Sequence, residues 1–134
     1  MKTLLRPSVL AFIMILAVTS CGQQPAKTTT LSGAEERERV AADIASNLAK
    51  NDYTAVRKDF AKIMLDAISV EKIKDNWESL TAKIGEYQNV VSTKESQLNG
   101  YNVIKKRCQF ASENATIQVT FNEENKVIGM YLKL

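Results

Sequence analysis

No histidine occurs among the 134 residues, and this absence limits the chemistry that the side chains can perform. Ser-His-Asp and Cys-His catalysis both require an imidazole, which is also the commonest metal-binding side chain. The two cysteines, Cys21 and Cys108, are too few to close a zinc site. The sequence also lacks a phosphate-binding glycine loop and a dinucleotide-binding fingerprint. We therefore expect neither a metal nor another cofactor.

Carboxylates and phenols can still exchange protons without a metal. Tyr53, Asp59 and Asp66 are the weak candidates for such catalysis, on the condition that a cavity holds them and perturbs their pKa values. Asp66 lies off the apolar side of its predicted helix, and aspartate is seldom buried, which favours solvated surface residues instead. A small metal-free acid–base enzyme is therefore kept as the alternative hypothesis.

Aromatic and sulfur-containing side chains are the candidates for lining a binding pocket. Each of them also suits a protein interior, because aromatic residues dominate core packing and a lone thiol usually behaves as a small buried hydrophobe. Both interpretations stay open for the six candidate pocket residues, which are Phe60, Trp77, Tyr87, Cys108, Met130 and Tyr131.

The densest basic run is Lys105-Lys106-Arg107, which falls in a predicted strand. Side chains alternate between the two faces of a strand, so Lys106 points away from the face that carries Lys105 and Arg107. Lys106 would then either attract an anion at the mouth of a pocket or stay solvated at the margin of the sheet.

The N-terminal segment has the pattern of an export signal. Lys2 and Arg6 precede residues 9–18, VLAFIMILAV, which carry no charge. This run is shorter than the roughly 20 apolar residues that a membrane-spanning helix needs, and it ends in small residues, as secretory signals do. The sequence Val18-Thr19-Ser20-Cys21 resembles the lipobox of bacterial lipoproteins, in which the cysteine receives lipid. We expect a signal peptide at 1–20, a lipidated Cys21 with a flexible tether at 21–31, and a single domain at 32–134.

This interpretation also predicts a location. Long acyl chains on Cys21 would hold the protein on a membrane, since each buried methylene contributes about 0.8 kcal/mol. Gly22, rather than an acidic residue, follows the cysteine, so we expect the outer membrane, facing the periplasm, in a cell with two membranes. Loss of Lys2 and Arg6 leaves 16 basic against 15 acidic residues, a near-neutral balance that does not suggest nucleic acid as a partner.

The periodicity of the domain predicts an α+β fold. Ser32 and Glu35 form a capping-box pattern before a helix that ends near Asn51. A second helical stretch covers 52–67, with a break expected near Asp59, and a third helix covers 70–84 around Trp77. Four strands follow at 88–98, 101–110, 114–121 and 126–134, the first two joined by an Asn-Gly turn. Three N-terminal helices should therefore pack on one face of a curved, four-stranded antiparallel sheet.

Several of these residues recur in an order typical of one family. The sequence resembles a bacterial domain family of unknown function, found alone in lipoproteins and also ahead of α/β-hydrolase domains. That family is similar in fold to the nuclear-transport-factor-2-like (cystatin-like) superfamily, in which a curved sheet wraps around helices as a cone. This chain has no Gly-x-Ser-x-Gly elbow, so hydrolase activity is not implied. The residues that carry the resemblance, spread over 34–134, are Trp77, Leu80, Gly85, Gly100, Tyr101, Val103, Phe110, Ile117, Val119, Phe121, Ile128, Gly129 and Tyr131.

The leading hypothesis is a non-enzymatic, lipid-anchored module that binds a small apolar ligand or an envelope protein. A small-molecule site predicts an open apolar cavity lined by Trp77 or Tyr131. A protein partner predicts a filled cone and an exposed apolar patch on the outer face of the sheet, involving Tyr101, Val103 or Tyr131. The same patch would also allow a homodimer.

Overall fold

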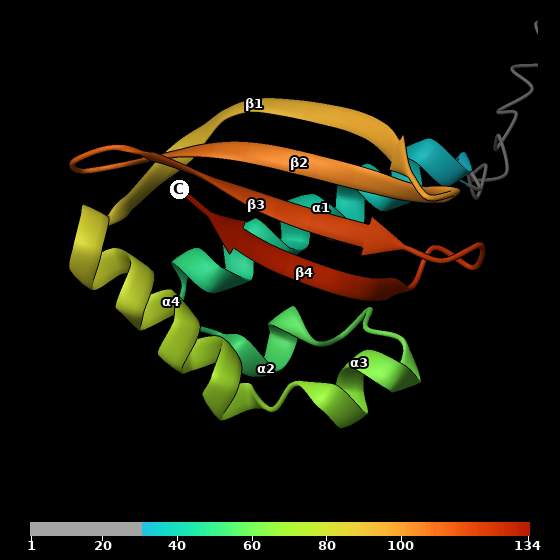
Figure 1. Cartoon of the computed structure of the whole chain (residues 1–134), viewed down its shortest axis with the longest axis horizontal. Helices are drawn as coiled ribbons and strands as arrows, with labels where there is room; N and C mark the ends of the chain where they lie inside the picture. The colour runs from blue at the N-terminus through green and yellow to red at the C-terminus, as the bar shows by residue number, and fades with distance from the viewer. Residues whose placement is uncertain (1–30) are drawn as a thin grey trace, which may run out of the picture.

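Four helices precede four strands in the computed structural model, which describes residues 31–134 (Figure 1). This order confirms the predicted α+β class. The predicted signal peptide, Cys21 and the tether up to residue 30 lie outside the described residues. The helices are α1 (Gly33–Ala49), α2 (Tyr53–Val56), α3 (Lys62–Ala67) and α4 (Val70–Ile84), and the strands are β1 (Tyr87–Leu98), β2 (Tyr101–Phe110), β3 (Asn114–Phe121) and β4 (Val127–Lys133).

The strands form one sheet in the order β1-β2-β3-β4, and every neighbouring pair is antiparallel, as predicted. Asn99 and Gly100 both have positive φ, at 51° and 82°, which is the backbone requirement of a tight two-residue hairpin. The meander leaves β1 and β4 as the two edges of the sheet.

The structure has four helices instead of the predicted three, because the break expected near Asp59 divides the second helical stretch into the separate helices α2 and α3. Between them the chain runs briefly beside the start of β4. The Ala61 N–H donates to the Val127 carbonyl at 2.8 Å, and the Val127 N–H donates to the Asp59 carbonyl at 2.9 Å. A backbone that makes these bonds cannot also continue the helix, and it buries Phe60 against the sheet.

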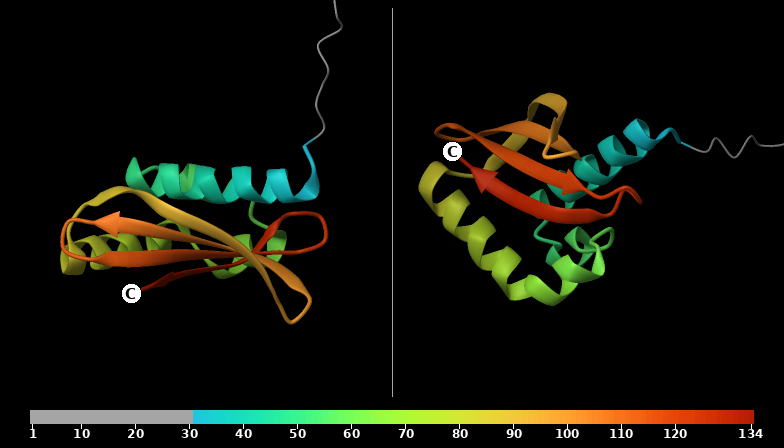
Figure 2. Two further views of the ribbon diagram at one scale, coloured as in Figure 1. Left: turned by 90° about the horizontal axis from the view of Figure 1, so that it is seen from above. Right: turned by 45° about the vertical axis from the view of Figure 1, so that its right-hand side comes forward.

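The helices cover one face of the sheet and one of its edges. Helix α1 passes behind the sheet, whereas α2, α3 and α4 lie along the side where β4 is found (Figures 1 and 2). The core lies between these layers. It combines the apolar side of α1, including Ile44 and Leu48, with Ile73 and Trp77 of α4 and with alternate residues of the inner sheet face. None of the helices in residues 31–134 is long and apolar enough to cross a membrane.

Gly85 ends α4 in a conformation that other residues avoid. Its φ is 89° and its ψ is −174°, and its N–H donates to the Thr81 carbonyl at 2.8 Å. The β2–β3 turn closes on this point, so that a Cβ atom on Gly85 would lie 2.5 Å from the Cβ of Ala111. Both the backbone and the available space therefore require glycine.

We predict that Gly85→Ala lowers the free energy of unfolding by more than the roughly 1–3 kcal/mol expected from the backbone alone, because the contact with Ala111 adds to it. Gly100→Ala is the matched control, since Gly100 also has positive φ but no atom within 4 Å of its added Cβ. Urea unfolding of both variants measures the difference. Equal losses of stability would contradict the proposed steric contact.

Candidate functional site

An open groove runs between α4 and β4. It has a volume of about 490 Å³ and joins apolar residues from both elements to a few polar ones. Such a mixture of apolar surface and sparse polar groups is typical of binding sites. The lining residues are Ile68, Ile73, Asn76, Ser79, Leu80, Lys83, Met130, Tyr131, Leu132 and Leu134.

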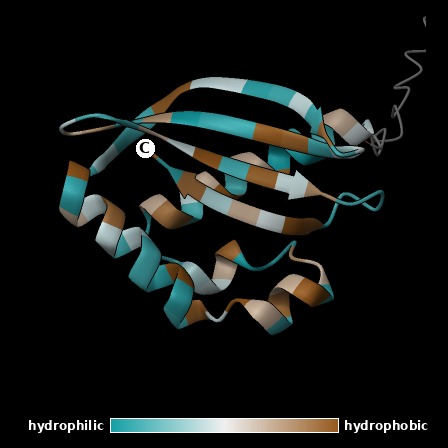
Figure 3. Ribbon diagram, viewed as in Figure 1, coloured by the Kyte–Doolittle hydropathy of each residue, from teal (hydrophilic) through white to brown (hydrophobic). Residues whose placement is uncertain are grey.

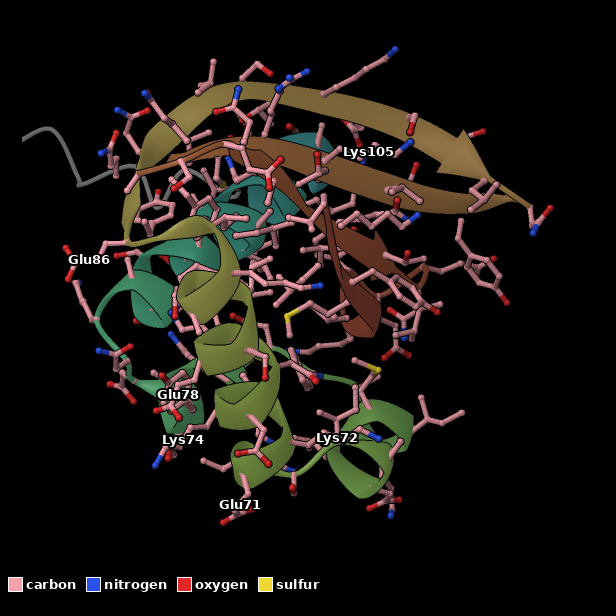
Figure 4. The ribbon with its side chains drawn as sticks, turned by 60° about the vertical axis from the view of Figure 1, so that its left-hand side comes forward. Glu71, Lys72, Lys74, Glu78, Glu86 and Lys105 are labelled. Atoms are coloured by element: carbon pink, nitrogen blue, oxygen red, sulfur yellow. The ribbon has the colours of Figure 1, made fainter. Side chains whose placement is uncertain are left out.

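Helix α4 forms one wall of the groove. The Ser69 hydroxyl caps its first turn by accepting from the Lys72 N–H at 3.2 Å. Ile73 and Leu80 recur at helical spacing and are buried, which fixes how the helix is rotated against the sheet. That rotation places Asn76, Ser79 and Lys83 along the groove. The charged residues Lys74 and Glu78 project from the other side of α4 (Figure 4).

Strand β4 forms the other wall, and it presents an edge of the sheet rather than a face. Met130 and Leu132 belong to the inner side of the sheet and are packed against the core, whereas Tyr131 lies on the outer side and is 56% exposed. Because the groove follows the edge of the strand, side chains from both faces line it. Beyond the two bonds of Val127, no backbone hydrogen bond joins this edge to another part of residues 31–134.

The six candidate pocket residues do not form one site. Met130 and Tyr131 come together in the groove. Phe60, Trp77 and Cys108 are buried in the core, where burial raises the pKa of the Cys108 thiol to about 11. The ring of Trp77 lies 5.6 Å from that of Phe110 and 6.1 Å from that of Tyr87, which is partly buried. Trp77 therefore packs in an aromatic cluster between α4 and the sheet.

The three catalytic candidates also lie apart, and none of them lines the groove. Tyr53 is buried, its hydroxyl donates to Asn51 Oδ1 at 2.9 Å, and burial raises its pKa. Asp59 lies 3.8 Å from the guanidinium of Arg39 and 3.9 Å from the ammonium of Lys126.

The third candidate, Asp66, is exposed and pairs with Lys62 at 2.7 Å. Within residues 31–134, no group of three or more acidic or cysteine side chains is placed to hold a metal ion.

Both predictions for Lys106, an anion-attracting residue at the mouth of a pocket or a solvated residue at the margin of the sheet, were wrong. Lys106 lies on the inner face of the sheet and is only 4% exposed. Its ammonium donates to Glu38 Oε1 at 2.6 Å and to Thr93 Oγ1 at 3.0 Å, and thereby joins α1 to β1 and β2. Arg37 and Glu95 form a second ion pair between α1 and β1. The N-terminal half of α1 is thus held on the sheet by charged side chains.

Sequence reasoning missed the α4 side of the groove. Leu80 was named only for the family resemblance, and Ile73, which shares the apolar stripe of α4 with it, was not named as a site residue. Asn76, Ser79 and Lys83 were not singled out either. A usable signal was present, because small and polar residues interrupt the side of the stripe that faces the last strand. Recognising it requires knowing that α4 lies beside β4, which a local pattern does not contain.

The Glu38–Lys106 pair generates a stability prediction. Glu38→Ala leaves the ammonium of Lys106 nearly buried with only a hydroxyl acceptor, so we expect a loss of about 1–3 kcal/mol in the free energy of unfolding. Lys106→Met removes the buried charge and fills the same space, so we expect a change within about 1 kcal/mol. Urea unfolding compares the two. A larger loss for Lys106→Met than for Glu38→Ala would show that the ion pair itself stabilises the fold.

Comparison with known proteins gives one match. Residues 41–130 match the family described as Protein of unknown function (DUF3887). The matched segment runs from α1 into β4, so it contains the α4 wall of the groove and, on the other wall, reaches only Met130. No curated protein and no solved structure matches the chain. Since the match covers well over half of the sequence, the chain belongs to the DUF3887 family of proteins of unknown function.

Proposed function

We propose that this protein is a non-enzymatic, lipid-anchored binding module of the bacterial cell envelope, and that its α4–β4 groove binds an extended segment of an envelope protein. The observation that carries the proposal is the position of the groove. One of its walls is the unpaired edge of a β-strand, and the other is an apolar helix side. An extended peptide can add to such an edge as a further strand.

The groove offers both parts of this mode of recognition. Main-chain hydrogen bonds to the free edge of β4 would supply affinity that does not depend on the peptide sequence, and apolar surface beside the strand would select the side chains. Ile68, Leu132 and Leu134 provide that surface, and Lys83 provides a positive charge at its border. We therefore expect a segment with alternating apolar residues.

The opposite edge of the sheet is a poorer candidate. Strand β1 has two irregularities in its register with β2, and it carries charged Lys94 and Glu95. Bulges and charges are the common means by which proteins protect an edge from pairing. β1 is largely hydrophilic, whereas β4 carries apolar residues along most of its length (Figure 3). This contrast favours β4 as the edge that accepts a partner.

A small apolar ligand is the second candidate for the same groove. Its volume of about 490 Å³ lies within the usual range for small-molecule sites. Such sites generally enclose most of the ligand, however, and this groove is open along the strand. Native mass spectrometry distinguishes the two, because a tightly held small molecule would appear as an extra mass that is lost on denaturation.

The sequence supports lipid anchoring of the protein, and the order of its helices and strands supports the superfamily relation. The uncharged run at residues 9–18 and the lipobox-like Val18-Thr19-Ser20-Cys21 support export and lipid attachment. The order of helices before an antiparallel meander, with helices on one face, supports a relation to the nuclear-transport-factor-2-like superfamily. An acid–base enzyme is less well supported, because Tyr53, Asp59 and Asp66 lie outside the groove.

We predict that peptides selected from a displayed random library bind in the groove, and that Ser79→Trp abolishes their binding. Ser79 is exposed on the α4 wall, so an indole there fills the groove without entering the core. Hydrogen exchange should slow at backbone amides of β4 when a selected peptide is added, because strand addition protects the edge.

Lys74→Trp is the matched control, since it places the same side chain on the other side of α4 (Figure 4). It should leave peptide binding unchanged. The proposal would be overturned if both variants bound equally well, or if the protected amides lay in β1 instead of β4.

We predict that Cys21→Ser abolishes incorporation of an alkyne-labelled palmitate into the protein in growing bacteria, because the thiol that would receive lipid is removed. Cys108→Ser is the control, since Cys108 is buried in the folded domain. Label that persists in Cys21→Ser would rule out Cys21 as the site of lipidation.

A further inference from the structure

The outer face of the sheet, which α1 does not cover, gathers positive charge. Lys94 and Lys105 lie directly opposite each other on β1 and β2, and Arg107 lies opposite Ser92 in the next row. Lys133 of β4 completes the group, opposite Thr116. We name these four residues, Lys94, Lys105, Arg107 and Lys133, the basic face. All four are exposed.

No carboxylate shares this face in the described part of the chain. The strand registers place only polar or apolar neighbours beside the four cations. Glu113 in the β2–β3 turn lines a shallow depression with Arg107 but forms no ion pair with it. The outer-face neighbours are Ser92, Ser96, Leu98, Tyr101, Val103, Gln109, Asn114, Thr116, Gln118, Thr120, Gly129 and Tyr131.

On the outer face basic residues lie apart from acidic ones, whereas in the rest of the domain the two kinds of residue are mixed. Of the 18 basic residues, Lys2, Arg6 and Lys27 precede residue 31, which leaves 15 against 15 acidic residues and a net charge of zero. Among the ion pairs within residues 31–134, most lie on the helices or on the inner side of the sheet, and none involves the basic face. A neutral domain thus keeps four unpaired cations together, although like charges opposite each other on a sheet are destabilising.

Exposed aromatic side chains accompany the charges. Tyr101 is 47% exposed and Tyr131 is 56% exposed, whereas Val103, expected at the surface, is buried at 1%. The ring of Tyr131 lies beside Gly129, and the ammonium of Lys133 lies 5.8 Å from the centre of that ring. The ammonium also donates to Gln118 at 3.3 Å. Of the three residues expected in an exposed apolar patch, the two tyrosines are therefore at the surface, and they lie among charged residues.

We infer that the basic face docks on the surface of a membrane that contains anionic phospholipids. Its charges come from three of the four strands and spread over the face of a sheet, with Arg107 beside the depression at the β2–β3 turn, which suits a charged plane better than a single chain. No helix of residues 31–134 covers this side of the sheet, so within the described domain it is free to approach such a plane (Figure 2). Tyrosine rings beside the lysines suit the boundary between water and lipid.

The orientation that follows is compatible with the groove. With the outer face toward the lipid, α1 lies on the far side of the sheet, and the α4–β4 groove lies at its edge (Figures 1 and 2). A partner could then enter the groove beside the membrane. The docking itself does not depend on lipid attachment or on a partner, so it can fail or hold independently of the function proposed above.

The test is co-sedimentation of the full chain carrying Cys21→Ser with vesicles of equal parts phosphatidylglycerol and phosphatidylcholine. Each basic residue near an anionic surface contributes about fivefold to binding, so Lys105→Gln with Arg107→Gln should weaken it roughly 25-fold. Lys72→Gln with Lys74→Gln, which removes two charges from α4, should change binding by less than about twofold. Binding of the parent chain should also fall with added salt.

Residues 1–30 are common to all these chains, so any lipid affinity of that segment cancels in the comparison. Lys105→Arg with Arg107→Lys keeps the charges and should retain binding, which separates a loss of charge from a loss of folding. The inference is overturned if the α4 variant loses as much binding as the basic-face variant, or if the basic-face variant binds the anionic vesicles as well as the parent chain does. Binding to poly-glutamate in preference to the anionic vesicles would overturn it in favour of an acidic protein.

Discussion

Burial of the inner face of the sheet is the constraint on which the rest of the structure depends. Ile104, Phe110, Ile117 and Phe121 all point to this face and are almost fully buried. Only helices that cover them can remove so much apolar surface from water, and α1 and α4 do so with their own apolar sides. The outer face carries mainly polar and charged residues and needs no such cover.

The same constraint creates the groove. Helix α1 covers the middle of the sheet, where its Arg37 and Glu38 bind charged partners on β1 and β2. The chain then forms α2, and the segment after it makes two backbone hydrogen bonds to Val127 at the start of β4. It continues through α3 and returns along β4 as α4. Once these bonds end, the remaining edge of β4 and the apolar side of α4 lie side by side and form an open groove.

Much of the fold could be predicted from local patterns. The capping box of Ser32 and Glu35, the Asn99-Gly100 turn and the change from helical to alternating periodicity each depend on neighbouring residues, and the structure contains all of them. The division between α2 and α3 was expected near Asp59, but its cause is a pair of backbone bonds to Val127, more than 60 residues away, which no local pattern contains. Lys106 was misread for a similar reason, since its partner Glu38 lies on a distant helix.

The candidate site was predictable only in part. Met130 and Tyr131 were identified from residue type, but the small and polar residues of α4 that face them indicate a site only once α4 is known to lie beside β4. Trp77 was equally compatible with a pocket or a core until its contacts with Tyr87 and Phe110 were known. A groove between two elements depends on their relative placement, which residue type and spacing do not specify.

The most direct test of the central claim is photo-cross-linking in intact cells. A photoreactive phenylalanine analogue at Ser79 would lie in the groove, and the same residue at Lys74 would lie on the other side of α4. We predict that the Ser79 site cross-links to an envelope protein through a short segment with alternating apolar residues, mapped by mass spectrometry, and that the Lys74 site does not. Cross-links that are the same at both sites, or none at Ser79, would contradict a partner bound in this groove.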